Sequence, residues 1–300
     1  FQKIPNIDQF IYNDIKSLER KIEENTHGGT SNIYAIIFES FSANTVSGLS
    51  EDFIHYLKNI SKKYNIILIA DEVYSGWGKT GFLFNFFRFK NFTPDIVTTS
   101  KGIGGGKSSI SAFVTKNNVF DQAYGKLNET FLHTSTYNGF GEECVTAIEA
   151  INIIQEENLV ENSKNFHKIL FEKVNLLMKK YPKIIKSFQG TGCLNGIEIV
   201  SPFSSLDKLI ADIPIKFIKD KKDFISKVTP IAICNELYKN HNILCTIRET
   251  KNKTFLSISP SLIVNESELD YFIDCLDKIF EKGLTKTVSK FYLEIIKGIF

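Results

Sequence analysis

Two stretches near the start of the chain carry apolar side chains at helical spacing. Over residues 12–24 the apolar residues stand three and four positions apart, which predicts a helix that begins at Asn13 or Asp14. The same spacing returns over residues 50–64, with Ser50 as the expected N-cap, acids in the first turn and lysines in the last. Both segments therefore predict amphipathic helices.

Two short apolar runs, one before and one after the second helix, have the character of strands. Residues 34–39 form the first run. The run over 65–73 is nearly continuous and leads into two carboxylates, which suits a central parallel strand buried on both faces. Strand, helix and strand make a βαβ unit with a right-handed crossover. Glu39 and Asp71 then both leave the sheet at its carboxyl edge, where open α/β sheets bind ligands.

The rest of the pattern predicts an α/β protein with a smaller α+β part. The expected elements are a glycine-punctuated loop at 72–81, an aromatic-rich packing segment at 82–92, strands at 94–100 and 108–116, a long helical region at 141–180, a strand at 192–200, an irregular insertion near 201–230, a helix at 231–241, strands at 243–249 and 254–260, and a helix at 265–280. Residues 285–300 predict an extra helix or the beginning of a further segment.

Composition changes this picture little, because it is that of an ordinary globular enzyme. A net charge of +2 with interspersed acids and bases gives no case for binding nucleic acid or an acidic membrane surface. No apolar run approaches the roughly 20 residues of a membrane helix. The five cysteines stand singly, without disulfide or metal-ligand spacing, and the histidines are equally dispersed. We expect buried thiols, no protein-bound metal and a reducing cytoplasm; no signal peptide is visible, although Phe1 is not a natural start.

The stretch 100–109, SKGIGGGKSS, raises the question of a phosphate-binding loop. Such a loop needs G-x-x-x-x-G-K-[ST] between a strand and a helix. Gly106, Lys107 and Ser108 supply the ending, but residue 101 is lysine where the first glycine should stand. The residues that follow alternate and are β-branched, so they predict a strand in place of the helix whose N-terminus holds phosphate. The sequence therefore argues against a nucleotide site.

Lys101 is the better candidate for chemistry. It stands at the end of a predicted strand, and the glycines after it leave room for a flat ligand beside its amine. Partial burial would lower the pKa of this amine, as a Schiff-base lysine requires. A solvated loop lysine is the simpler alternative. The position of Asp71, at the end of another buried strand, favours the chemical interpretation.

At these residues the chain resembles the class III (ornithine-type, subgroup II) aminotransferases, pyridoxal-phosphate enzymes of fold type I. The matching phrases are LIADEVYSGWGKTGFLF, PDIVTTSKGIGGG, HTSTYNG and GTGCLNGIEIV, and the resemblance covers about residues 7–280. It implies an α/β fold with a mainly parallel sheet. Residues 1–180 would be the C-terminal part of the cofactor-binding large domain with its connecting helix, 181–282 a small α+β domain with an insertion near 201–230, and 283–300 an extension.

The resemblance also implies roles for individual residues. Lys101 would form the Schiff base with pyridoxal 5'-phosphate and then shuttle the substrate proton. Asp71 would keep the pyridine nitrogen protonated, and Val73, on the same strand face, would press against the ring. Thr136 would bind the cofactor phosphate of the neighbouring subunit, so that the active site needs a homodimer. Glu39 would be the glutamate of the family's "EP" pair near the cofactor.

Each of these positions has a simpler alternative. Asp71 could bond a nearby turn, Val73 could be core, Thr136 could be a helix N-cap, and Glu39 could be a structural hydrogen-bonding group. Lys107 could reach a substrate or phosphate, but a solvated or interface lysine is the plainer interpretation.

The chain departs from the family pattern in two respects. Family members carry well over a hundred residues before the point where this sequence starts, including a turn that grips the cofactor phosphate. We therefore expect a C-terminal portion that binds cofactor poorly and is inactive alone. In addition, Ser257 stands where ornithine-type members often have arginine, and Asn44 stands where they have a glutamate. The hypothesis is that the substrate carboxylate is recognised differently or is absent.

The expected reaction is transamination between an amino donor and a keto or aldehyde acceptor. The same lysine and aspartate also serve racemases, epimerases and aminomutases of the family, and no motif separates these outcomes. A non-catalytic homologue that acts in dimerisation is the remaining alternative; intact Lys101 and Asp71 count against it.

Overall fold

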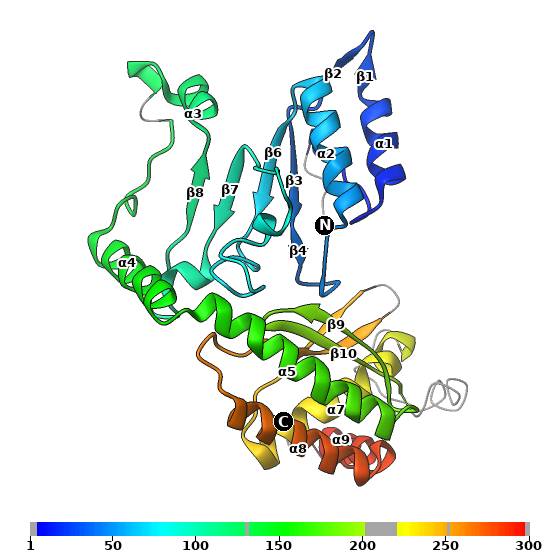
Figure 1. Cartoon of the computed structure of the whole chain (residues 1–300). Coiled ribbons are helices and arrows are strands. Elements are labelled where there is room, and N and C mark those ends of the chain that lie inside the picture. The colour runs from blue at the N-terminus through cyan, green and yellow to red at the C-terminus, as the bar shows by residue number, and fades with distance from the viewer. Residues whose placement is uncertain (1–4, 130–131, 202–220, 251–252, 298–300) are drawn as a thin grey trace. The chain divides into compact units, whose positions relative to one another are not determined.

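The computed structural model describes residues 5–129, 132–201, 221–250 and 253–297. It divides into two compact units, which are described separately (Figure 1). The first comprises Phe1–Ser42, Gly48–Gly78 and Phe82–Asn158, and the second comprises Ala43–Ser47, Lys79–Gly81 and Leu159–Phe300.

The first unit is built on a four-stranded sheet of order β3-β6-β7-β8. Its strands are β3 (Ala35–Glu39), β6 (Ile67–Asp71), β7 (Ile96–Thr99) and β8 (Ala112–Thr115). The first three strands are parallel and β8 is antiparallel to β7, which confirms the predicted α/β class with a mainly parallel sheet.

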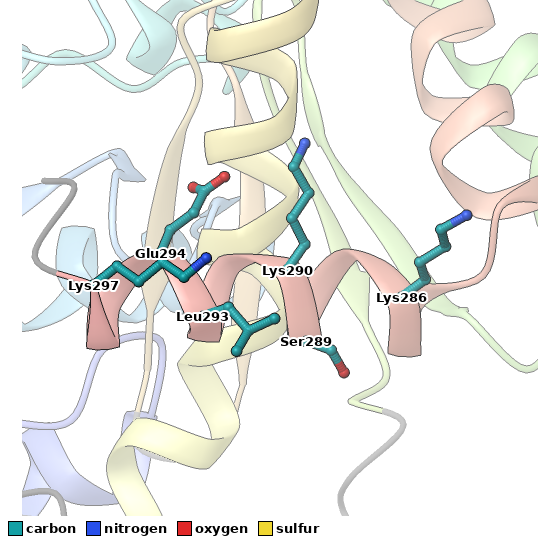
Figure 2. A pocket seen from close by; sticks show the side chains of 6 residues that line it. All are labelled: Lys286, Ser289, Lys290, Leu293, Glu294 and Lys297. Atoms are coloured by element: carbon teal, nitrogen blue, oxygen red, sulfur yellow. The ribbon is translucent and has the colours of Figure 1, made fainter.

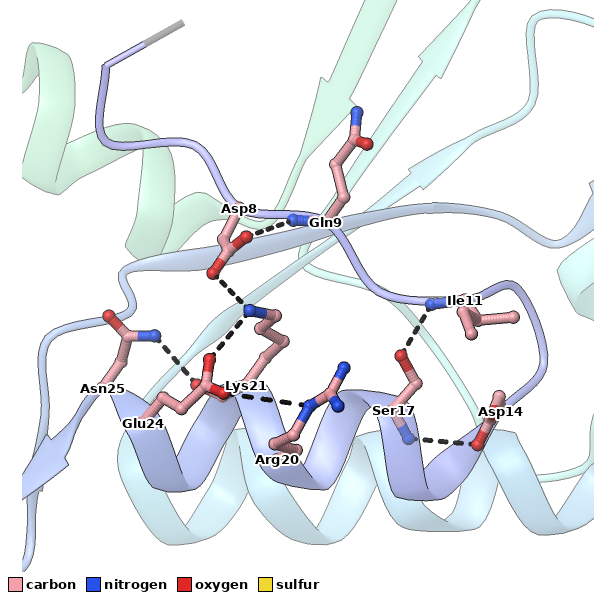
Figure 3. Close-up of polar contacts among 9 residues, drawn as sticks. All are labelled: Asp8, Gln9, Ile11, Asp14, Ser17, Arg20, Lys21, Glu24 and Asn25. Atoms are coloured by element: carbon pink, nitrogen blue, oxygen red, sulfur yellow. Dashed lines mark hydrogen bonds and ion pairs between the residues drawn. The ribbon is translucent and has the colours of Figure 1, made fainter. Parts of the chain in front are cut away.

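Helices α1 (Ile15–Glu24) and α2 (Glu51–Tyr64) begin at side-chain caps, as the sequence predicts. Asp14 Oδ1 accepts a hydrogen bond of 3.0 Å from the Ser17 amide (Figure 3). Ser50 Oγ accepts one of 3.2 Å from the amide of Phe53. Figure 3 also shows Lys21 between Asp8 and Glu24 near the end of α1.

These helices cover one face of the sheet with a single apolar core. The core consists of Leu18, Ile22, Ile36, Phe38, Leu49, Phe53, Ile54, Leu57, Ile60, Ile66, Leu68, Ala70, Phe86, Phe89, Phe92 and Val97. The aromatic segment at 82–92 is thus mostly packing, as predicted. The expectation that the 65–73 strand is buried on both faces is wrong: Ile67 and Ile69 are half-buried, because α1 and α2 pack on the other face. Ile37 on the neighbouring strand is 59% exposed.

The remaining elements of this unit are short, except for one helix. They are β1 (Thr26–His27), β2 (Thr30–Ser31), β4 (Phe41–Ser42), η1 (Asn85–Arg88), η2 (Lys101–Gly104), α3 (Asn117–Tyr124), η3 (Leu127–Glu129) and α4 (Gly141–Glu156); β5 (Ser47–Gly48) lies where the two units alternate along the chain. The strand expected at 108–116 is only β8, since residue 108 forms a bend and residues 109–111 have no regular structure.

The second unit pairs four antiparallel strands in the order β11-β12-β10-β9. The strands are β9 (Ile185–Thr191), β10 (Leu194–Ile199), β11 (Thr246–Glu249) and β12 (Thr254–Ile258). Helices α5 (Leu159–Lys180), α7 (Lys221–His241) and α8 (Glu266–Glu281) share one core with this sheet. The sequence pattern missed β9.

Two predicted boundaries differ from the structure. Within the insertion expected near 201–230, residues 202–220 lie outside the described residues, and 221–230 are not irregular but belong to α7. Pro230 stands inside α7, and a proline in a helical pattern suggests a break that here does not occur. The long helical region at 141–180 is two helices, separated at Asn158, whose φ is 52°.

The compact units and the expected domains also assign helix α5 differently: it lies in the second unit, but within the expected large domain. Its buried residues Phe166, Leu170 and Val174 belong to the core of the second unit. The family resemblance implies that this helix is the connecting helix of the large domain, and that functional division stays a prediction.

The segment after residue 283 forms α9 (Leu284–Ile296), one of the two outcomes expected for it. Val288 and Phe291 pack on Val228 and Ala232 of α7. Figure 2 shows a hollow along α9 that is lined by Lys286, Ser289, Lys290, Leu293, Glu294 and Lys297. Among the described helices, none combines the length and apolar character needed to cross a membrane.

Candidate active site

The carboxyl ends of three parallel strands bring candidate residues into register. Glu39 of β3 is the register partner of Asp71 of β6, and Asp71 is in turn the partner of Thr98 of β7. Parallel strands end at the same edge, so the prediction that Glu39 and Asp71 share that edge is confirmed. Lys101 follows two residues after the end of β7. The acid and the amine therefore leave adjacent strands.

Asp71 is the last residue of β6 and is half-buried. Its Oδ1 accepts a hydrogen bond of 3.0 Å from the amide of Val73. This local turn ends the strand, because a carboxylate that accepts from the backbone two residues on favours a turn over an extended chain. Val73 therefore lies beyond the strand, and the expectation that it shares a strand face with Asp71 is wrong. Its side chain is half-buried.

Lys101 opens the 3-10 turn η2 in a left-handed backbone conformation, with φ at 50°. Its side chain is exposed, so the expected partial burial is wrong for the described residues. The glycines that follow supply no side chains to cover the amine. Nζ lies 5.3 Å from the ring centroid of Tyr74, whose face attracts a cation. Sequence reasoning missed Tyr74, although it directly follows Val73 within the LIADEVYSGWGKTGFLF phrase.

Lys107 is exposed and does not form a phosphate loop. The amides of Lys107 and Ser108 both donate to the Gly104 carbonyl, at 2.9 and 3.2 Å, so they do not point at a ligand. Strand β8 follows, and no helix begins there. The prediction that this stretch is not a nucleotide loop is confirmed.

Thr136 lies in an exposed turn between η3 and α4. Helix α4 begins at Gly141, with Phe140 as its N-cap residue, so the alternative that Thr136 caps a helix is wrong. Among the described contacts, none joins Thr136 to Asp71 or Lys101. Its predicted role toward a neighbouring subunit stays a prediction.

Glu39 is half-buried at the end of β3. Burial raises the pKa of the Tyr12 phenol, and the electrostatic interaction with the negative charge of Glu39 raises it further. Glu39 thus stands at the strand edge next to Asp71, and its cofactor-related role stays a prediction.

Glu72, the second acid of the ADEV phrase, is fully buried and was missed as a site residue. Its carboxylate accepts hydrogen bonds from Ser40 Oγ and Ser75 Oγ, both at 2.5 Å. It also accepts from the amides of Asn85 and Phe86, both at 3.0 Å. Burial raises the pKa of Glu72, while these four donors oppose the rise. The carboxylate therefore joins the end of β3 to the loop after β6.

The two substrate-side positions lie in the second unit. Ser257 is 5% exposed in β12, where its register partners are Gly196 and Thr246, and it lines a surface hollow. Asn44 is exposed. Neither position carries a charge.

The fold and the strand-edge residues define an α/β protein with an acid and an amine at the carboxyl edge of a parallel sheet. The sequence matches the family described as Aminotransferase class-III over residues 2–280, so the chain belongs to the class-III aminotransferases. The family indicated by the sequence motifs is confirmed.

Individual relatives agree with this assignment. The taurine–pyruvate aminotransferase of Bilophila wadsworthia is 32% identical over 230 residues, which are 75% of this chain and 46% of that protein. The ornithine aminotransferase of Oceanobacillus iheyensis is 27% identical over 279 residues, 92% of this chain and 58% of that protein. A transaminase from the marine bacterium Virgibacillus shares the fold, with a TM-score of 0.74, 23% identity and coverage of 93% and 59%. The chain spans about half the length of the curated relatives it matches.

Proposed function

We propose that the protein is a pyridoxal-phosphate-dependent aminotransferase that moves an amino group from an amino donor to a keto or aldehyde acceptor. The observation that supports this most is the pairing of strand ends. Asp71 ends β6, Thr98 of β7 is its register partner, and Lys101 follows β7. An acid and an amine at the ends of adjacent strands can contact the same bound ligand.

The residues present fit this cofactor by the chemistry of their donor and acceptor atoms. Lys101 offers an exposed amine to an aldehyde carbon. The Val73 amide donates a hydrogen bond to Asp71 Oδ1. Among the described residues none donates to Oδ2, so this oxygen is the one that would accept from the N–H of the cofactor ring. When bound, the cofactor supplies a protonated ring that accepts electron density from the substrate α-carbon.

The chain's own residues would then act on protons. Asp71 would hold the proton on the ring nitrogen, because a carboxylate close to that nitrogen favours its charged form. Lys101 would remove the proton from the substrate α-carbon and return it to C4′ of the cofactor as general base and acid. Val73 and Glu39 are proposed to border the ring, and Thr136 to bind the phosphate held by the neighbouring subunit.

A homodimer is part of this proposal. The segment around Thr136 exposes several large apolar side chains, among them Leu132, Tyr137, Phe140 and Val145. Large exposed apolar side chains that gather in one region are typical of an interaction site. A second copy is the proposed occupant, because the role expected for Thr136 requires one. The cytoplasm is the proposed location, and the five free thiols suit a reducing compartment.

The proposed substrates are amines whose recognition does not depend on an arginine at position 257. Ser257 is buried and uncharged, and Asn44 is uncharged as well. We expect ornithine to be a poor donor. A panel of ornithine, taurine and simple monoamines with pyruvate as acceptor checks this, and efficient use of ornithine would contradict it.

The test of the proposed function asks which lysine holds the cofactor. The full-length protein is incubated with pyridoxal phosphate, treated with borohydride and digested, and the adduct is located by peptide mass. We expect the adduct on Lys101 and its loss in Lys101→Ala. Lys107→Ala is the matched control, six positions away, and should keep the adduct. An adduct on Lys107, or none, would overturn the proposal.

A further inference from the structure

The backbone at Lys101 needs support from its surroundings. A non-glycine residue with φ near 50° is uncommon, because its Cβ crowds the backbone in this left-handed conformation. It persists only where neighbouring contacts fix it. The contacts on both sides of Lys101 therefore decide where its amine can reach.

Trp77 supplies those contacts on one side. Its indole Nε1 donates a hydrogen bond of 2.6 Å to Thr99 Oγ1, two residues before Lys101. A Cβ added to Gly102, the residue after Lys101, would lie 2.8 Å from Trp77 Cβ. Trp77 is only 8% exposed, and its ring meets Phe84 edge-on at 5.2 Å. One side chain thus touches the chain before and after Lys101.

We propose that Trp77 is a positioning residue for Lys101: its indole holds Thr99 and Gly102, and so fixes the left-handed turn that presents the amine. The inference rests on Lys101 as the amine of the proposed function. It assigns a task to the loop between the ADEV and SKGIGGG phrases.

Trp77 can act as a support because its own loop is anchored. Glu72 accepts from Ser75 Oγ and from the amides of Asn85 and Phe86, on both sides of Trp77 in sequence. The Gly76 amide donates to the Glu72 carbonyl at 2.9 Å. The loop is therefore tied to a buried carboxylate at several points, and the indole has little freedom to move.

The far end of the same turn is also closely packed. A Cβ on Gly105 would lie 3.0 Å from the Ala150 Cβ of α4, and Gly105 itself has a φ of 57°. The turn that Lys101 opens is thus packed at two positions, Gly102 against Trp77 and Gly105 against Ala150. Its side chain remains exposed while its backbone is held.

The test distinguishes an amine that is correctly positioned to react with pyridoxal phosphate from an amine that is only exposed. Two single variants, Trp77→Phe and Thr99→Val, and their double variant are prepared in the full-length protein. Each is compared for borohydride-fixed capture of pyridoxal phosphate by Lys101 and for reductive methylation of Lys101 by formaldehyde. Capture requires geometry, whereas methylation requires only an exposed amine. Phe87→Leu, at an exposed aromatic residue of η1, is the control.

We expect the capture rate at Lys101 to fall roughly 10- to 100-fold in both single variants, because small misplacements of a reacting group cost this much. Methylation should stay unchanged. The double variant should be no worse than the poorer single variant, since both remove one hydrogen bond. Hydrogen exchange at the Gly105 amide, which donates to Gly102 at 3.1 Å, should become faster.

Additive losses in the double variant, or unchanged exchange at Gly105, would overturn the inference. Thr99→Val keeps the side-chain volume nearly constant, so it serves even where Trp77→Phe fails to fold. If the unsubstituted protein captures no pyridoxal phosphate on Lys101, the proposed function is wrong. Exchange at Gly105 still decides whether Trp77 holds the turn in that case.

Discussion

At the scale of single residues, two neighbouring acids differ in burial and in their hydrogen-bond partners. Asp71 and Glu72 are adjacent, and successive side chains at a strand end point to opposite sides. Asp71 is half-buried at the ligand edge, whereas Glu72 is fully buried among four hydrogen-bond donors. One acid is therefore available to a ligand and the other holds the fold. The two acids should respond differently to the same substitution.

Asp71→Asn should weaken cofactor use and leave stability nearly unchanged. The amide oxygen can still accept from Val73, so the local turn remains. An amide cannot hold the proton on a pyridine nitrogen, so we expect the transamination rate to fall about 10²- to 10³-fold. Steady-state rates and urea unfolding of the same preparations measure both effects. Asp121→Asn, at an exposed acid on α3, is the control. An unchanged rate would refute the assigned role.

Glu72→Gln should show the reverse pattern, with a clear loss of stability. The substituted side chain keeps its volume, but its NH₂ group cannot accept from the donors that face it. Two of the four donors would be left buried without a partner, which costs about 2–5 kcal/mol in the free energy of unfolding. Urea titration measures this. Ser75→Ala, which removes one donor and leaves the carboxylate, should cost less; equal losses in both variants would contradict the account.

At the scale of elements, strand ends and caps could be predicted, while the environment of side chains could not. Alternation and cap residues are local, so Asp14, Ser50 and the ends of β3 and β6 follow from sequence spacing. The exposure of Lys101 depends on which side chains lie above it, and glycines give no local sign of that. Strand β9 was missed because it contains Gly190 and is only partly buried beyond Ile185. Long-range packing determines such features.

The contact among α5, β9 and β10 should make the second unit sensitive to acid. His167 Nδ1 lies 2.8 Å from Asn195 Oδ1, and the Asn195 amide group donates to Gly192 at 2.7 Å. Asn195 thus presents an acceptor, so His167 Nδ1 carries the hydrogen. The ring stacks on Phe188 with centroids 6.1 Å apart. Burial lowers the pKa of His167 below 6.5, and the hydrogen bond to Asn195 opposes this.

A lowered histidine pKa means that the folded state binds fewer protons than the unfolded state. The stability that His167 contributes is present above pH 6.5, its pKa in the unfolded chain. This stability is lost as the pH falls through the lower pKa of the folded state. We expect the free energy of unfolding to decline below that pH, and His167→Gln to reduce the decline. His55→Gln, an exposed histidine on α2, is the control. Urea titrations at pH 8 and pH 5.5 measure this; an identical decline in His167→Gln would contradict it.

At the scale of the whole molecule, the region from β8 onward exposes apolar side chains that a lone chain would not leave in water. The largest exposed apolar side chains between residues 113 and 153 are Phe113, Val114, Phe120, Leu127, Leu132, Tyr137, Phe140, Val145, Ile148 and Ile153. Both faces of β8 are exposed, and β8 is an edge of its sheet. Edges of this kind are covered in stable proteins. A subunit contact over this face suits the position of Thr136.

Charged substitutions in this region should therefore break the proposed dimer. Val145 and Ile148 of α4 are 68% and 58% exposed, so the double variant Val145→Lys, Ile148→Lys should fold. We expect the molar mass from light scattering to fall from that of a dimer to that of a monomer. Leu176→Lys, on α5 at 64% exposure, is the matched control and should leave the mass unchanged. A dimer that survives the double variant would place the contact elsewhere.

A sharper test follows if each active site takes Lys101 from one subunit and Thr136 from the other. Lys101→Ala protein and Thr136→Val protein should each be nearly inactive. Unfolding and refolding an equal mixture forms mixed dimers in half of the cases, and each mixed dimer has one intact site. The activity recovered should be about one quarter of the unsubstituted value, by the symmetry of a two-fold dimer. Recovery is impossible if both residues serve the same subunit's site, because every site would then carry one defect. An inactive mixture, in which size analysis still finds mixed dimers, therefore contradicts the shared site and leaves Lys101 alone as the proposed catalytic residue.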